Sequence, residues 1–111
     1  MGSRDVPKRL DIAFQALANE HRREIIHALS LQPCSISQLA SMRRLSLQAI
    51  HKHISVLHNA GLLVRKKIGR TNFLALRRQS FRAAQAWLEQ YHTYWGHDEE
   101  TLENYARYLR R

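Results

Sequence analysis

The segment that most constrains the fold covers residues 45–63 and reads LSLQAIHKHISVLHNAGLL. Three of its apolar side chains recur at helical spacing and would share one buried face: Ile50, Ile54 and Leu57. Ser46 is a favourable residue to cap the start of a helix, and the Asn59-Ala60-Gly61 run is typical of a helix end. The segment therefore predicts an amphipathic helix with one face packed on a core and the other face open.

A shorter helix is predicted just before this one. Ser35 and Gln38 have the spacing of a capping box, in which each side chain accepts a hydrogen bond from the other residue's backbone N–H. This pattern predicts a helix from Ser35 to about Met42. Two short helices joined by a turn of three or four residues form a helix-turn-helix.

Two further helices are predicted near the N-terminus. Within residues 9–18, three apolar side chains stand at helical spacing: Leu10, Phe14 and Leu17. Asn19 is a favourable N-cap for a second helix over residues 20–31, and Pro33 would end that helix.

A basic β-hairpin is predicted after the helix-turn-helix. Residues 62–67 and 72–76 have the composition of strands, and Gly69 suits the tight turn between them. Most of the charge of the hairpin comes from Arg65, Lys66, Lys67 and Arg70. The hairpin is therefore expected to be strongly cationic.

The C-terminal residues predict the longest helix of the chain. Apolar side chains recur at alternating spacings of three and four residues, and this register carries through Gly96. The pattern therefore predicts one continuous or slightly bent helix with a length of roughly 40 Å. The apolar stripe is wider than a small domain would cover alone, so we interpret it as a dimer interface. The alternative is two helices, broken at Gly96-His97 and folded back on the domain. With residues of the first helix, the predicted interface comprises Leu10, Phe14, Leu17, Phe81, Trp87, Leu88, Tyr91, Tyr94, Trp95, Leu102, Tyr105 and Leu109.

Charge is segregated along the chain. The 18 Lys and Arg residues outnumber the 9 Asp and Glu residues, giving a formal net charge of +9. No acid occurs between Glu24 and Glu89, whereas that interval holds ten Lys and Arg residues. Because soluble surfaces ordinarily mix the two signs, this exclusion indicates a surface that faces a polyanion such as the phosphate backbone of a nucleic acid.

The length and the remaining composition set the protein class. A chain of 111 residues is expected to form a single domain (residues 1–111), with a winged helix-turn-helix over 9–78 and a dimerisation helix over 79–111. No apolar run is long enough to span a membrane, and the N-terminus lacks the pattern of a signal peptide. The single cysteine, Cys34, cannot form an internal disulfide. We therefore expect a cytoplasmic protein with no membrane association.

The order of the predicted elements is that of a winged helix-turn-helix, a mainly α fold with a small β-hairpin and a long C-terminal dimerisation helix. The sequence resembles the ArsR/SmtB-like bacterial transcriptional repressors. The matching stretches are LANEHRREIIHAL (17–29), SISQLA (35–40), residues 45–63 and KKIGRTNFLAL (66–76). The tail AWLEQYHTYW (86–95) is similar to a branch of that family that lacks metal sites. The resemblance implies a homodimeric repressor whose fourth helix enters the major groove of double-stranded operator DNA.

The predicted DNA contacts fall into two groups. Side chains near the start of the fourth helix would read base edges: Leu47, Gln48, Ala49, His51 and Lys52. Other side chains would contact the DNA backbone: Ser46, Arg43, Arg44, His53, Ser55, Arg65, Lys66, Lys67 and Arg70. Arg43 and Arg44 stand where the family often has glycine or leucine, so the exact geometry of the turn is open.

The residues do not support a metal site, a cofactor or an enzyme. The family's thiolate positions hold Ser35 and Ser37 here, and the first half of its terminal-helix site would fall on Ala84 and Ala86. His51 and His53 lack a second ligand four residues on. The chain has no nucleophile motif and no phosphate-binding glycine loop.

Two other functions are kept open at this point. A winged helix can dock on an acidic protein partner without reading DNA, and a metal-responsive repressor would use ligands outside the known patterns, with His92 and His97 the first to test. The inducing signal, whether a small molecule or a protein, is not predicted by the sequence.

Overall fold

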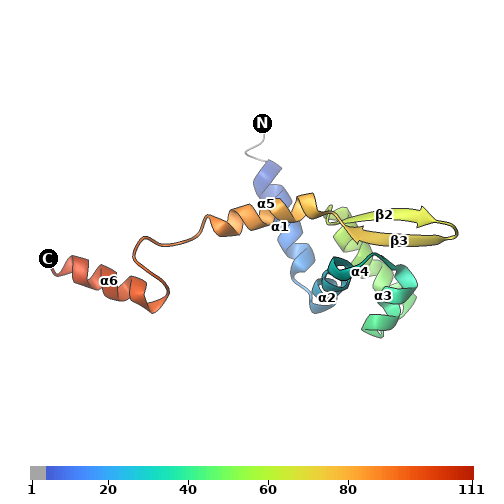
Figure 1. Cartoon of the computed structure of the whole chain (residues 1–111), viewed down its shortest axis with the longest axis horizontal. Helices are drawn as coiled ribbons and strands as arrows, with labels where there is room; N and C mark the ends of the chain where they lie inside the picture. Colours follow the sequence, from blue (N-terminus) through green and yellow to red (C-terminus); the bar gives the residue numbers. More distant parts are fainter. Residues whose placement is uncertain (1–4) are drawn as a thin grey trace.

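The computed structural model of the protein describes residues 5–111. This part of the chain forms six helices and one three-stranded antiparallel sheet. In chain order the elements are α1 (Asp5–Leu17), α2 (Glu20–Leu31), β1 (Cys34–Ser35), α3 (Ile36–Arg43), α4 (Leu47–Asn59), β2 (Leu63–Ile68), β3 (Thr71–Leu76), α5 (Arg78–Glu89) and α6 (Glu99–Leu109). Helices α2 to α4 lie beside the sheet, the β2–β3 hairpin projects at one end, and α5 and α6 extend in the opposite direction (Figure 1).

Three predicted helix starts are confirmed by their capping hydrogen bonds. The Asn19 side chain accepts a bond of 3.2 Å from the backbone N–H of the third residue after it. Ser35 and Gln38 form the reciprocal capping box, with bonds of 3.1 and 2.8 Å. The Ser46 hydroxyl accepts a bond of 3.1 Å from the backbone N–H of Ala49. These bonds satisfy donors that the first turn of a helix leaves free.

The sheet contains the predicted hairpin and one strand that was not predicted. Strands β2 and β3 pair from Leu63 opposite Leu76 to Ile68 opposite Thr71, leaving a two-residue turn at 69–70. Gly69 has a φ of +63°, the left-handed conformation that the first turn residue needs. Strand β1 pairs with the other edge of β3 through two residues only, too short to give a periodic signal in the sequence.

The core joins α4 to the rest of the winged domain. The three apolar residues predicted to be buried on α4 are at most 1% exposed: Ile50, Ile54 and Leu57. They belong to one cluster with buried side chains from α2, α3, the sheet and the residue before β2: Ile25, Leu39, Cys34, Leu63, Leu74 and Leu62. Burial raises the pKa of the Cys34 thiol, so this side chain stays a protonated, apolar part of the core.

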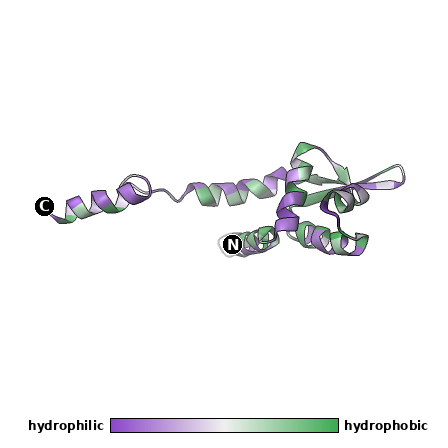
Figure 2. Cartoon of the chain, turned by 90° about the horizontal axis from the view of Figure 1, so that it is seen from below, coloured by the Kyte–Doolittle hydropathy of each residue, from purple (hydrophilic) through white to green (hydrophobic). Residues whose placement is uncertain are grey.

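The prediction of one continuous C-terminal helix is wrong. Helix α5 ends at Glu89 and α6 begins at Glu99, and the residues between them are not helical. The folded-back alternative is not observed either, because α6 lies away from the winged domain in both views (Figures 1 and 2). None of the helices in residues 5–111 combines the length and the apolar character needed to cross a bilayer.

Backbone conformation explains the break. Gly96 has a φ of +112° and Asp98 a φ of +48°, so neither continues a right-handed helix. The Thr93 and Thr101 hydroxyls donate to the Gly96 carbonyl over 2.9 and 3.0 Å, and the Asn104 amide donates to the Trp95 carbonyl. Two of these donors, Thr101 and Asn104, lie on α6, so side chains of α6 bind carbonyls of the connecting segment. In an uninterrupted helix the same carbonyls would accept backbone hydrogen bonds within the helix.

Candidate nucleic-acid interface

The turn between α3 and α4 holds a strained residue at its first position. Arg44 has φ 54° and ψ 41°, the left-handed conformation for which glycine is usual and which costs other residues about 1–2 kcal/mol. The Leu45 N–H donates to the Ala40 carbonyl over 3.0 Å, closing the end of α3. The turn therefore keeps the geometry of a glycine-containing turn although arginine occupies it, and the exposed Arg44 side chain lies beside the start of α4.

The outward face of α4 is open along the length that sequence analysis indicated. Four of the predicted contact residues on this face are exposed together with Leu47: Gln48, His51, Lys52 and Ser55. Ala49 is half-buried, so it is the least accessible of the predicted base readers. The Ser46 hydroxyl accepts the Ala49 N–H, which leaves its own proton free to donate to an anion.

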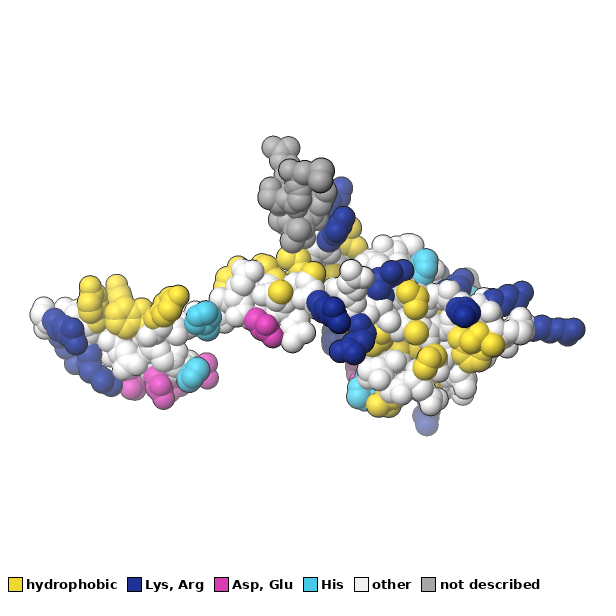
Figure 3. Space-filling view, turned by 45° about the horizontal axis from the view of Figure 1, so that its top comes forward, with side chains coloured by type: hydrophobic (Ala, Val, Ile, Leu, Met, Phe, Trp, Pro, Cys, Tyr) yellow, Lys and Arg dark blue, Asp and Glu magenta, His cyan; other side chains and the backbone are white. Residues whose placement is uncertain are grey.

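The hairpin places its cations on both faces of a two-stranded ribbon. Arg65, Lys66, Lys67 and Arg70 are all exposed. Because side chains alternate along a strand, Lys66 lies on the face opposite Arg65 and Lys67. Lys and Arg side chains are spread over the winged domain and the hairpin tip, whereas acidic side chains gather on α6 (Figure 3).

Arg43 does not point freely into solvent. Its Nε and Nη2 atoms donate to Nδ1 of His21 over 3.2 and 3.1 Å. Arginine has no acceptor, so this ring nitrogen carries no proton. The predicted DNA-backbone contact is thus half-buried and joins the end of α3 to the start of α2.

His53 is held in a second arginine–histidine pair. Its Nδ1 atom lies 3.3 Å from Nη1 of Arg22, and its ring centroid lies 5.4 Å from that of His21. Burial lowers the pKa of His53, with further lowering by the charges of Arg22 and His21. The half-buried His53 ring therefore packs as a neutral side chain against Arg22 and His21, which favours a packing role over the DNA-backbone contact predicted for it.

Arg22 has a structural role that was not predicted from the sequence. Its Nε donates to the Ala16 carbonyl over 2.6 Å and its Nη2 to the Gln15 carbonyl over 3.3 Å. The same guanidinium reaches His53, so it ties the end of α1 to α4. No sequence pattern could have shown this contact, because the paired residues are 31 positions apart.

Five of the twelve residues predicted for a dimer interface form two aromatic clusters. Phe14 of α1 and Trp87 of α5 meet edge to face with ring centroids 5.6 Å apart, and Tyr91 lies 4.8 Å from Trp87. Trp95 packs against Tyr105 of α6 at 5.2 Å. Leu17 and Phe81 pack against the core. The more exposed apolar residues of the predicted set are Leu88, Tyr91, Tyr94, Leu102, Tyr105 and Leu109.

Comparison with known proteins identifies the family. The sequence matches the bacterial regulatory protein, arsR family, over residues 19–64. The crystal structure of an ArsR family transcriptional regulator is 36% identical, with a TM-score of 0.70, and the similarity covers 76% of this chain and 87% of that one. The chain belongs to the ArsR family. Its fold is that of ArsR-family transcriptional regulators, with a winged helix-turn-helix DNA-binding domain, rather than that of an enzyme.

Other solved structures are similar to this ArsR-family chain. An ArsR-like transcriptional regulator from Rhodococcus sp. RHA1 is 32% identical with a TM-score of 0.69, covering 75% of this chain and 78% of that one. A homodimeric winged helix-turn-helix DNA-binding domain from Mycobacterium bovis is 17% identical with a TM-score of 0.66, covering 85% and 99%, and shows likeness of fold alone. None of the curated proteins matches the sequence.

The described residues contain no cluster that could hold a metal ion. Within residues 5–111, no group of three or more His, Cys, Asp or Glu side chains comes together in a metal-binding arrangement. Three of the seven histidines, His51, His53 and His58, lie on α4, where the first and last are exposed and the middle one is engaged with Arg22.

Proposed function

We propose that this ArsR-family protein is a homodimeric repressor that binds a specific sequence of double-stranded DNA. The observation that carries the proposal is the exposed outer face of α4, which an exposed arginine in the turn precedes along the chain and a cationic hairpin follows. An acid-free stretch from Ile25 to Leu88 contains all three elements, so no carboxylate from it would repel phosphates.

Base recognition is assigned to the exposed side chains at the start of α4. The Gln48 amide can form two hydrogen bonds with an adenine edge, and the His51 ring can donate to or accept from a base. Leu47 is 55% exposed and suits contact with a thymine methyl group. Lys52 suits guanine or phosphate, and Ala49 would contribute only through its partly exposed methyl group.

Backbone contacts are assigned to the turn and the hairpin. Arg44 and the hairpin cations are exposed, as is Ser55, and they would position the protein rather than specify the sequence. Arg43 and His53 contribute indirectly, because their pairs with His21 and Arg22 hold α3 and α4 against α2.

Dimerisation is assigned to the apolar surface of α1 and the C-terminal segment. Exposed aromatic and leucine side chains on α5 and α6 form an apolar surface larger than the chain itself covers. A two-fold dimer would place two copies of α4 on half-sites one helical turn of DNA apart, or a multiple of that.

The test compares base-reading variants with matched controls on DNA from upstream of the protein's own gene. Gln48→Ala and His51→Ala are expected to lower the ratio of specific to nonspecific affinity by about tenfold each, from the 1–3 kcal/mol of a good base contact. Gln15→Ala and His58→Ala remove exposed side chains of the same types outside the proposed contact and should leave the ratio unchanged.

Salt dependence and footprinting complete the test. The logarithm of affinity should fall steeply with the logarithm of salt concentration, and the footprint should show two symmetric half-sites. Equally weak binding to upstream and random DNA at physiological salt would instead favour a module that docks on an acidic protein.

A further inference from the structure

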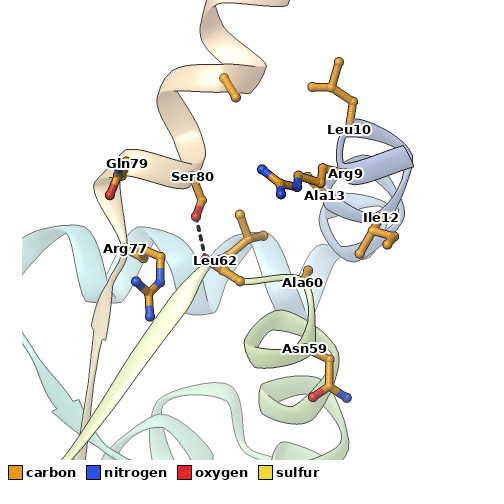
Figure 4. Close-up of a pocket in the computed structure, with 12 residues that line it drawn as sticks. Arg9, Leu10, Ile12, Ala13, Asn59, Ala60, Leu62, Arg77, Gln79 and Ser80 are labelled. Atoms are coloured by element: carbon orange, nitrogen blue, oxygen red, sulfur yellow. Dashed lines mark hydrogen bonds between the residues drawn. The ribbon is translucent and has the colours of Figure 1, made fainter. Parts of the chain in front are cut away.

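A cavity of about 550 Å³ lies where α1, the end of α4 and the start of α5 meet (Figure 4). This volume falls within the range of about 300–1,000 Å³ that is usual for small-molecule sites. Its position is separate from the outward face of α4, so it could be occupied without covering the proposed DNA contact. Helix α1 forms one wall and α5 the other.

Among residues 8–111, whose side chains the structure describes, the lining has apolar walls and cationic groups but no acid. Apolar surface comes from Leu10 and Ala13 of α1, Leu62 after α4 and Ala83 of α5. The charged side chains of the lining are two arginines, Arg9 from α1 and Arg77 from just before α5. Arg9 reaches from α1 into the opening toward α5, while Arg77 lies at the rim with its guanidinium directed away from Arg9 (Figure 4). The described lining residues thus contribute two positive charges and no negative one.

We propose that this cavity binds a small amphipathic anion, in which a carboxylate is joined to an apolar body of hydrocarbon size. The carboxylate would accept charge-assisted hydrogen bonds from Arg9, and from Arg77 after its exposed side chain turns toward the opening. The hydrocarbon would lie against Leu10, Ala13 and Ala83, replacing water at apolar surface. The cavity thus favours this ligand class over a neutral or cationic molecule with the same apolar body.

The floor of the cavity is joined directly to the end of the DNA-reading helix. The Ser80 hydroxyl donates to the Gly61 carbonyl over 2.6 Å, and the backbone N–H of Arg77 donates to the Leu62 carbonyl over 2.9 Å. Gly61 follows α4 in a left-handed conformation, with a φ of +76°. Because these two bonds tie the start of α5 to the end of α4, a ligand that separates α1 from α5 would shift the end of α4 together with α5 relative to α1. This regulatory consequence rests on the proposed DNA-binding function, whereas ligand binding itself does not.

The first experiment measures binding to the whole chain without DNA. Octanoate, octan-1-ol and octylammonium carry the same apolar body with charges of −1, 0 and +1, and each is titrated while amide chemical shifts are followed by NMR. Octanoate should bind at least about tenfold more tightly than octan-1-ol, with shifts at the lining residues, because charged hydrogen bonds contribute about 1.5–3 kcal/mol each. Octylammonium should bind least.

Matched variants test the residues. Arg9→Gln and Arg77→Gln should each weaken octanoate binding about tenfold, while Lys8→Gln and Arg78→Gln remove exposed neighbouring charges outside the lining and should have little effect. Ala83→Leu adds bulk at an exposed lining position and should abolish binding, whereas Ala86→Leu on the same helix should not. Retained secondary structure by circular dichroism separates loss of the site from loss of the fold.

Several outcomes would overturn the proposal. Equal affinity for octanoate and octan-1-ol would show that the cavity does not recognise the negative charge. Unchanged octanoate affinity in the Arg9→Gln and Arg77→Gln variants would show that these arginines do not bind the carboxylate. Binding lost at protein concentrations that favour self-association would show that a second copy fills the cavity instead. A final titration with operator DNA tests regulation. If octanoate binds at the cavity and the DNA affinity does not change, only the regulatory part of the proposal is wrong. If the protein does not bind operator DNA at all, only the proposed function is wrong.

Discussion

The winged domain and the C-terminal segment differ in the burial of their apolar side chains. In the winged domain, Ile50, Ile54 and Leu57 are at most 1% exposed and pack on neighbours from three other elements. In the C-terminal segment, Tyr94 is 93% exposed and Leu102 74% exposed, and α6 has no buried residue. The winged domain is thus stabilised by its own core, whereas within residues 5–111 the apolar surface of α6 is covered in part by Trp95 and is otherwise left exposed.

Core truncation should give the largest difference between the two regions. Ile54→Ala removes a fully buried side chain of α4 and should lower the free energy of unfolding by about 2–5 kcal/mol. Leu102→Ala in α6 should change it by less than about 0.5 kcal/mol at concentrations where the chain is monomeric. Urea unfolding followed by circular dichroism measures both. Similar losses for the two variants would mean that α6 is packed on the domain in solution.

Self-association tests the other half of the comparison. Trp87→Ala removes the contact of α5 with Phe14 and should weaken the dimer by about 2 kcal/mol or more, a dissociation constant some 30-fold higher, if this aromatic cluster is an interface hot spot. Sedimentation equilibrium provides the measurement. Gln85→Ala, an exposed position on the same helix, serves as the control and should leave the dissociation constant unchanged. A monomeric native protein at high concentration would contradict the interface.

A stabilising substitution is expected inside the winged domain, at the turn before α4. Arg44→Gly relieves a left-handed conformation and should raise the free energy of unfolding by about 1 kcal/mol. DNA affinity should fall together with its dependence on salt, because one exposed cation is lost. Arg44→Ala is the control: it removes the same charge without relieving the backbone. Equal stability of the glycine and alanine variants would show that the turn is unstrained.

The smallest expected effect is a dependence of stability on pH. The pKa of His53 is lowered in the folded chain, so as pH falls from about 7 the unfolded state takes up a proton first, near the ordinary histidine value of about 6.5. The free energy of unfolding should therefore decrease with falling pH until it passes the folded-state pKa. His53→Asn keeps an acceptor for Arg22 and should flatten this dependence, whereas His58→Asn should not. Urea unfolding at pH 7, 6 and 5 distinguishes them.

Local signals explain why most of the winged domain could be predicted. Asn19, Ser35 and Ser46 each cap a helix through residues three positions on, so the sequence contains both partners of each bond. The buried stripe of α4 could be predicted from the helical spacing of its apolar residues alone. Strand β1 could not be predicted because it has two residues and depends on pairing with Phe73 and Leu74 far along the chain.

Long-range contacts and the C-terminal segment explain what could not be predicted. The continuous C-terminal helix was predicted by following the helical spacing of aromatic residues through a segment in which Gly96 and Asp98 have positive φ angles. Spacing alone does not reveal whether the backbone between two apolar residues is continuous. The pairing of Arg43 with His21 likewise joins residues 22 positions apart, so a charge expected at the DNA surface proved to be engaged within the fold.

The bond between the Ser80 hydroxyl and the Gly61 carbonyl has a consequence for operator architecture. It fastens the first turn of α5 to the second residue after the end of α4. In a dimer formed through α1 and α5, the separation of the two DNA-reading helices would then be set by how the α5 helices pack. Substitutions in that packing, far from any base, would change the number of base pairs between preferred half-sites without changing the sequence read within each one.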